Sequence, residues 1–179
     1  MSRKAPNKTP ANRKSIRKTA KDDTSSREIL RHWQEAVPND RLAHLVKDAT
    51  RALVRALQLR LADHDIPFGH WSFLRILWEK DGLTQRELSA RAGVMEPTTY
   101  RALKIMATRG YITKRQAPGN KKNNYIYLTA KGRALKKKLI PLAEEVNRIA
   151  VGKVKSADIA ATRKTLLAII ANLAKDEAE

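Results

Sequence analysis

The feature that most constrains this chain is the block from Leu83 to Leu103, LTQRELSARAGVMEPTTYRAL. Thr84 followed three residues later by Glu87 is a capping box, which predicts the start of a short helix. Gly93 can adopt the positive φ of a tight turn, and Pro97 suits the first turn of a second helix. Two short helices joined in this way are typical of a helix-turn-helix, whose second helix enters the major groove of DNA.

The second helix of this motif would carry most of the DNA contacts. Its inward face would hold four apolar side chains, Val94, Ala102, Leu103 and Met106. We expect DNA to be bound by the opposite face and by the start of the first helix, through Thr84, Glu96, Pro97, Thr98, Tyr100, Arg101 and Lys104. Arg101 is the best candidate for reading bases, because a guanidinium can form two hydrogen bonds with guanine. The alternative is a helical hairpin without a DNA role, which the charge and the following hairpin argue against.

A β-hairpin is predicted after the helix-turn-helix. Residues 111–115 and 125–128 alternate as two strands, and the polar segment 116–124 joins them. Such a hairpin is the wing of a winged helix, and we expect its basic side chains to contact DNA: Lys114, Arg115, Lys121 and Lys122. Because lysine binds phosphate as a point charge, the wing should add affinity more than sequence discrimination.

Helices are predicted on both sides of this motif. Apolar side chains at helical spacing indicate helices over 27–37, 41–63 and 70–80, and two more that begin after caps at Thr129 and Ser156. Pro141 should kink the first of these last two helices. The expected fold is therefore mainly α with a small β-hairpin wing, in which a winged helix-turn-helix is flanked by helices at both ends.

These features together resemble the MarR family of winged helix-turn-helix transcriptional regulators. The resemblance runs from about Asp40 to Leu173, and the wing ends in Leu128-Thr129-Ala130-Lys131-Gly132 where the family usually shows Leu-Thr-x-x-Gly. It implies a homodimer whose first and last two helices interdigitate. The predicted segments are then a disordered basic tail (1–26), N-terminal dimerisation helices (27–66), the winged domain (67–129) and C-terminal dimerisation helices (130–179).

Two positions depart from the family pattern. Met95 occupies a place where the family often has a serine or threonine, so the cap of the second helix passes to Glu96 or goes unfilled. The wing tip carries Asn120-Lys121-Lys122 where the family usually has Asp-Arg-Arg.

Charge points to a polyanionic partner. The 179 residues include 37 Lys and Arg against 18 Asp and Glu, a formal net charge of +19. Much of the positive surplus lies outside the acid-free first 21 residues, so it does not belong to the tail alone. Such a surplus fits double-stranded DNA, and a membrane surface is the weaker alternative because only charge supports it. The longest apolar run, residues 166–171, is far too short to cross a bilayer.

Catalysis and metal binding are not predicted. The chain has no cysteine, which excludes a disulfide scaffold, thiolate ligands and a thiol redox switch. Its four histidines share no metal-ligand spacing, and no phosphate-binding glycine loop or Ser/His/Asp signature is present. We therefore expect no cofactor, no metal and no enzyme.

A small-molecule effector is implied by the resemblance, because MarR-like proteins commonly hold aromatic acids or their thioesters between the dimer helices and the winged domain. Aromatic and cationic side chains near that place are the candidate ligands: His44, Arg51, His70, Trp71, Phe73 and Arg75. The aromatic members could equally belong to the core. The resulting hypothesis is a cytoplasmic, ligand-responsive repressor that leaves a palindromic operator when it binds an aromatic acid or thioester. The alternative is a sequence-tolerant architectural DNA-binding protein without an effector.

Overall fold

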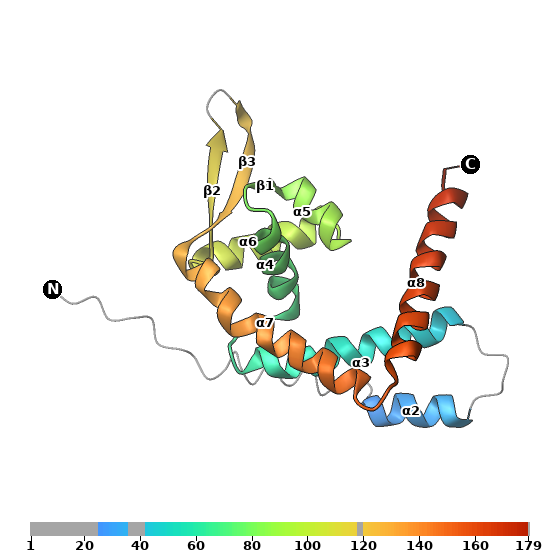
Figure 1. Cartoon of the computed structure of the whole chain (residues 1–179). Helices are drawn as coiled ribbons and strands as arrows, with labels where there is room; N and C mark the ends of the chain where they lie inside the picture. Colours follow the sequence, from blue (N-terminus) through green and yellow to red (C-terminus); the bar gives the residue numbers. More distant parts are fainter. Residues whose placement is uncertain (1–24, 36–41, 118–119, 179) are drawn as a thin grey trace.

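The computed structural model describes residues 25–35, 42–117 and 120–178 (Figure 1). Residues 1–24 of the predicted disordered tail lie outside the described residues, whereas Ser26, its last predicted residue, begins the first helix. Along the chain the elements are α2 (Ser26–Glu35), α3 (Leu42–Ala62), α4 (Phe68–Glu79), β1 (Leu83–Thr84), α5 (Gln85–Ala92), α6 (Glu96–Thr108), β2 (Ile112–Ala117), β3 (Asn120–Leu128), α7 (Ala130–Val151) and α8 (Ser156–Asp176). The prediction of a mainly helical fold with a small β wing is confirmed.

The helix-turn-helix forms as its local signals predict. Thr84 accepts a hydrogen bond from the backbone N–H of Glu87, and the Glu87 carboxylate accepts one from the backbone of Thr84 in return. Gly93 ends α5 with φ of 63°, in the left-handed region that favours glycine. Met95 stands at the cap of α6 without a side-chain cap bond, so that position is unfilled.

Four local predictions were wrong. The segment 116–124 is mostly strand instead of a loop, because β2 continues to Ala117 and β3 begins at Asn120. Val94 is 38% exposed instead of buried, because the turn after Gly93 carries it away from the core. Helix α4 begins at Phe68 rather than near residue 70, since Pro67 already serves as its cap. Lys155, and not Ser156, occupies the cap position of α8, and no side chain caps that end.

The sheet has three strands in the order β1-β3-β2, all antiparallel (Figure 1). Sequence patterning predicted the β2–β3 hairpin but missed β1, because two residues are too short to show an alternating pattern. Leu83 pairs with Ile126, and Ile112 pairs with Leu128 across β3. The base of the wing is thus tied to the residues that precede α5.

One hydrophobic core joins the winged domain to α3 and α7. It includes Leu61 from α3, Leu74 and Leu77 from α4, Leu103 from α6 and Leu139 from α7, all at most 1% exposed. A buried leucine of this kind stabilises the fold by about 2 kcal/mol. Outside this core, α3 and α7 run beside each other and Arg60 pairs with Glu145 at 3.2 Å.

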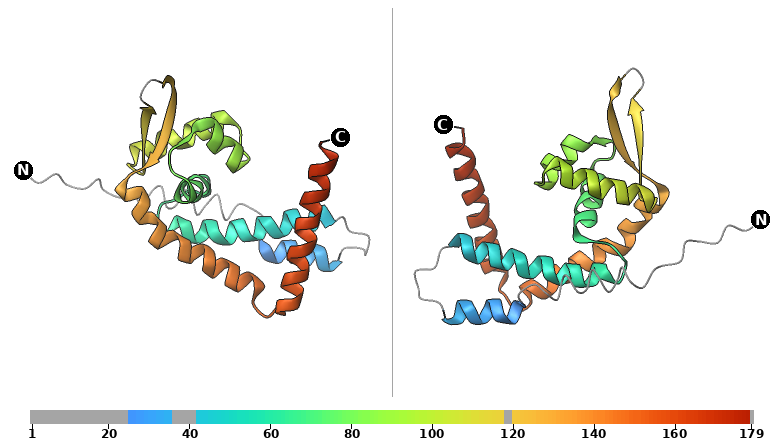
Figure 2. Two further views of the ribbon diagram at one scale, coloured as in Figure 1. Left: turned by 45° about the horizontal axis from the view of Figure 1, so that its top comes forward. Right: turned by 180° about the vertical axis from the view of Figure 1, so that it is seen from behind.

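Helices α3 and α7 form a platform away from the wing, and α8 extends from it as an arm (Figure 2). No described residue of α8 is buried, although Leu167, Ile170 and Leu173 lie on it and are more than half exposed. At the other side α2 packs against α3 through Ile29, and the Trp33 indole N–H donates to Asp48 at 3.1 Å. No helix among the described residues is both long and apolar enough to cross a membrane.

Candidate nucleic-acid interface

Helix α6 presents its polar face to solvent. All six of its predicted DNA-contacting residues are exposed: Glu96, Pro97, Thr98, Tyr100, Arg101 and Lys104. Leu103 and Met106, on the opposite face, are fully buried. The charge of Glu96 also suits its place in the first turn, where the helix dipole is positive.

A buried hydroxyl pair holds α6 against α5. The Ser89 and Thr99 hydroxyl oxygens are hydrogen-bonded at 2.8 Å, and the Ser89 hydroxyl oxygen also lies 2.9 Å from the Gln85 carbonyl oxygen. Thr99 is fully buried, so its polar group needs such a partner. This pair sets how the second helix leaves the turn. The sequence offered only a weak signal for it, since Thr98 and Thr99 are adjacent and one of them has to face inward.

A polar cleft of about 500 Å³ lies where α5, α6 and the wing meet. It brings together four of the predicted residues, Thr84, Glu96, Tyr100 and Lys114, and adds three polar residues that sequence reasoning missed, Gln85, Arg86 and Asn124. The Lys114 ammonium lies 5.4 Å from the centroid of the Tyr100 ring, a cation–π contact between wing and recognition helix. The cleft therefore places one cation of the wing, Lys114, beside the face of α6 that would meet the bases.

The wing carries its own cations. Lys114 and Arg115 are exposed on β2, and the Arg115 guanidinium lies 5.5 Å from the centre of the Tyr127 ring. Lys121 and Lys122 belong to β3, but their side chains lie outside the described part of the chain.

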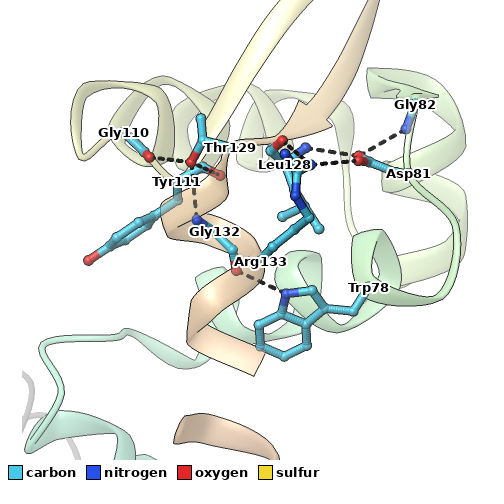
Figure 3. Close-up of polar contacts among 9 residues, drawn as sticks. All are labelled: Trp78, Asp81, Gly82, Gly110, Tyr111, Leu128, Thr129, Gly132 and Arg133. Carbon is cyan, nitrogen blue, oxygen red and sulfur yellow. Dashed lines mark hydrogen bonds and ion pairs between the residues drawn. The ribbon is translucent and has the colours of Figure 1, made fainter. Parts of the chain in front are cut away.

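The first turn of α7 is anchored under the wing (Figure 3). The Thr129 hydroxyl accepts from the backbone N–H of Gly132 and donates to the Gly110 carbonyl at 2.6 Å. Gly132 passes so close to the preceding corner that a Cβ there would lie 2.0 Å from the Tyr111 carbonyl oxygen. This close approach gives a physical reason for the glycine of the Leu-Thr-x-x-Gly pattern.

The six residues predicted to bind an effector do not gather at one place. Trp71 and Phe73 are buried in the core, and His70 is 5% exposed. Arg75 is exposed and pairs with Glu79 on its own helix at 3.4 Å. The other two lie on α3, where His44 is exposed and Arg51 pairs with Asp48 at 3.6 Å.

His70 is the buried titratable group of this region. Burial, and secondarily the positive charge of Arg109, lowers the pKa of His70 from 6.5 to about 4. Its Nδ1 atom is buried and has no hydrogen-bond partner among the described residues. Because this side chain is 5% exposed and surrounded by core residues, its position favours a core role. Within the same described ranges, no group of three or more His, Asp or Glu side chains could hold a metal ion.

The exposed second helix, the tight glycine turn and the antiparallel wing define a winged helix-turn-helix protein. Residues 68–123 match the model of the MarR family. The regulator TtmR of Methylorubrum extorquens is 30% identical over 101 residues, which cover 56% of this chain and 52% of that protein. The chain thus spans about half the length of the curated relatives it matches. The winged helix-turn-helix region of the chain is therefore similar to that of MarR family regulators.

Solved structures are similar to this fold over about three quarters of the chain. A protein from Listeria monocytogenes, solved with a 26mer DNA, is 27% identical with a TM-score of 0.68, and the match covers 77% of this chain and 91% of that one. A MarR transcriptional regulator from Methanosarcina mazei Go1 has a TM-score of 0.68 at 21% identity, with coverage of 75% and 96%. The second likeness shows the fold alone.

Proposed function

We propose that this protein is a DNA-binding transcriptional regulator that reads an operator with α6. The single observation that carries the proposal is the exposed polar face of α6, with Arg101 at its centre and the Lys114 contact beside it. The family match and the DNA bound to the Listeria protein support the same conclusion. With DNA as its partner, we also propose a cytoplasmic location.

We further propose a homodimer. Helices α3 and α8 enclose an apolar groove of about 670 Å³, lined at its two sides by Leu45 and Leu166. The exposed leucines and isoleucine of α8 offer a matching apolar surface, and contiguous apolar patches of this kind mark interaction sites. A second copy of the chain satisfies both faces by twofold symmetry, which also suits a palindrome with half-sites about 34 Å apart. The four segments predicted from the sequence are retained on this basis.

We also propose that a small-molecule effector controls DNA binding. An aromatic carboxylate or its thioester would release the repressor from DNA if it bound more tightly to a dimer with a different spacing between its recognition helices. Support comes from the family resemblance, with His44 and Arg51 on the accessible surface as first contacts to test. Trp71 and Phe73 lie in the core, so they would support the wall of such a site without contacting the effector.

The direct test of the reading role is Arg101→Ala. Loss of a two-pronged contact to guanine should weaken operator binding by about 1–3 kcal/mol and relax the preference at one base pair. Fluorescence anisotropy on the selected site and on its single-base variants measures both effects. An equal loss on every sequence would show that Arg101 contacts phosphate and would contradict the reading role.

An architectural DNA protein without an effector is the second candidate, favoured by the excess of positive charge and by the two lysines at the wing tip. Footprinting separates the two candidates. A regulator protects one short site, whereas an architectural protein covers DNA of any sequence and shows a steep dependence on salt.

A further inference from the structure

The backbone of Leu128, the last residue of the wing, is held at both of its polar groups by side chains from two other elements (Figure 3). Its N–H donates to the Asp81 carboxylate at 2.8 Å, and its carbonyl accepts from the Arg133 guanidinium at 2.6 Å. Asp81 and Arg133 also pair with each other at 3.6 Å, and the same Asp81 oxygen accepts from the N–H of Gly82. The end of β3 is thereby fixed between the residues that follow α4 and the first turn of α7.

A second contact ties α4 to the same turn. The Trp78 indole N–H donates to the Gly132 carbonyl at 3.0 Å, and the Trp78 ring meets Trp71 edge-on. This carbonyl belongs to the residue that already touches the Tyr111 backbone. Helix α7 therefore starts from a turn that is held by α4, by the corner before β2 and by the end of the wing.

We call this set of contacts among Trp78, Asp81, Leu128, Gly132 and Arg133 the junction. Because it lies at the first turn of a long helix, a small rotation there moves the far end of the helix by a large distance. With 22 residues, α7 is about 33 Å long, and beyond its midpoint it lies against α3, where Glu145 pairs with Arg60. A tilt of about 10° at the first turn would move the far end by roughly 6 Å over that length. One base pair advances the DNA helix by only about 3.4 Å. A small rotation at the junction therefore displaces the far end of α7 by more than the rise of one base pair.

We propose that Trp78, Asp81 and Arg133 are positioning residues, which do not touch DNA but set the separation of the two recognition helices by locking the winged domain onto α7. This inference rests on the proposed function, since it requires a dimer that binds two half-sites. It assigns to the end of α4 a role that the family match does not describe.

The test is a spacing profile. DNA selected by the wild-type protein from random sequence is resynthesised with the half-sites moved closer or farther apart by one and by two base pairs. Each base pair changes both the distance and the angle between half-sites, by roughly one tenth of a helical turn. We expect the wild-type protein to bind about tenfold more weakly at one base pair from the optimum. In Trp78→Phe and Asp81→Asn, the loss of affinity at one base pair from the optimum should fall to about threefold or less.

The variants are chosen to keep the fold. Trp78→Phe retains an aromatic ring beside Trp71 but loses the bond to Gly132. Asp81→Asn retains an oxygen for the two backbone N–H groups and loses the charge that Arg133 faces. Glu79→Gln makes the same acid-to-amide change two positions earlier, at the last residue of α4. Among the described residues its side chain forms an ion pair with Arg75, outside the junction, so this variant should leave the profile unchanged.

A flattened profile in both junction variants supports the proposal. Affinity that falls by the same factor at every spacing overturns it, as does a wild-type profile without an optimum. Failure of the wild-type protein to prefer any DNA sequence overturns the proposed function instead. In that case spin labels at Ile105→Cys and Lys137→Cys still test the junction, because the chain has no other cysteine. The distance distribution between α6 and α7 should broaden in Trp78→Phe, and an unchanged width would contradict a positioning role.

Discussion

Replacing Gly132 with alanine should destabilise the protein, although the same change in most helices is favourable. Alanine is better than glycine by about 1 kcal/mol inside a helix. At Gly132 the added Cβ would meet the Tyr111 carbonyl oxygen at 2.0 Å and a methyl group of Leu128 at 3.1 Å. Because the first obstacle is backbone, the turn has to move, and overpacking of this kind costs about 1–3 kcal/mol or more. After the helical gain is subtracted, we expect a net loss of up to about 2 kcal/mol.

Urea denaturation measures this change, with all variants compared at one protein concentration because a dimer is stabilised by mass action. Gly69→Ala is the matched control, since that glycine also lies in a helix and its added Cβ would meet nothing within 4 Å. The control should be neutral or slightly more stable than the wild type. If Gly132→Ala were as stable as Gly69→Ala, the close approach of α7 to the corner before β2 would be refuted.

Three further predictions concern other parts of the molecule. Because the pKa of His70 is lowered to about 4 from 6.5, the unfolded chain takes up a proton between these values while the folded protein does not. Stability should therefore fall as pH drops from 6.5 to 4, by up to about 3 kcal/mol. His70→Leu should flatten that pH dependence, and an unchanged slope would show that other groups cause it. Ser89→Ala leaves the buried Thr99 hydroxyl without its hydrogen bond to Ser89, so it should cost about 1–3 kcal/mol in thermal unfolding; no loss would show that the pair does not hold α6. Ile170→Glu places a charge on the exposed apolar face of α8 and should shift the protein toward monomer in analytical ultracentrifugation, whereas an unchanged dimer would exclude this face from the interface.

Local signals in the sequence predicted the parts of the fold that depend on neighbouring residues. The capping box of Thr84 and Glu87, the turn at Gly93 and the cap at Thr129 involve partners within a few positions, and all three are confirmed. The helices α3 and α7 were also predictable, because apolar side chains at helical spacing lie on one face of each.

Contacts between distant residues could not be predicted in the same way. Strand β1 exists only because Leu83 pairs with Ile126, and Asp81 acts on Leu128, which lies 47 positions further along the chain. In the effector region, helix α4 is buried on most of its surface, so spacing alone could not decide which side chains face a cleft. Trp71 and Phe73 thus looked equally suited to a ligand wall and to the core.

The central claim is that this protein recognises a particular short DNA sequence through α6. The most direct measurement is a quantitative mobility-shift titration on DNA from the promoter of its own gene, with random DNA of equal length as competitor. The account predicts a preference of about a thousandfold or more for one near-palindromic site at physiological salt. Equal affinity for promoter and random DNA would contradict it.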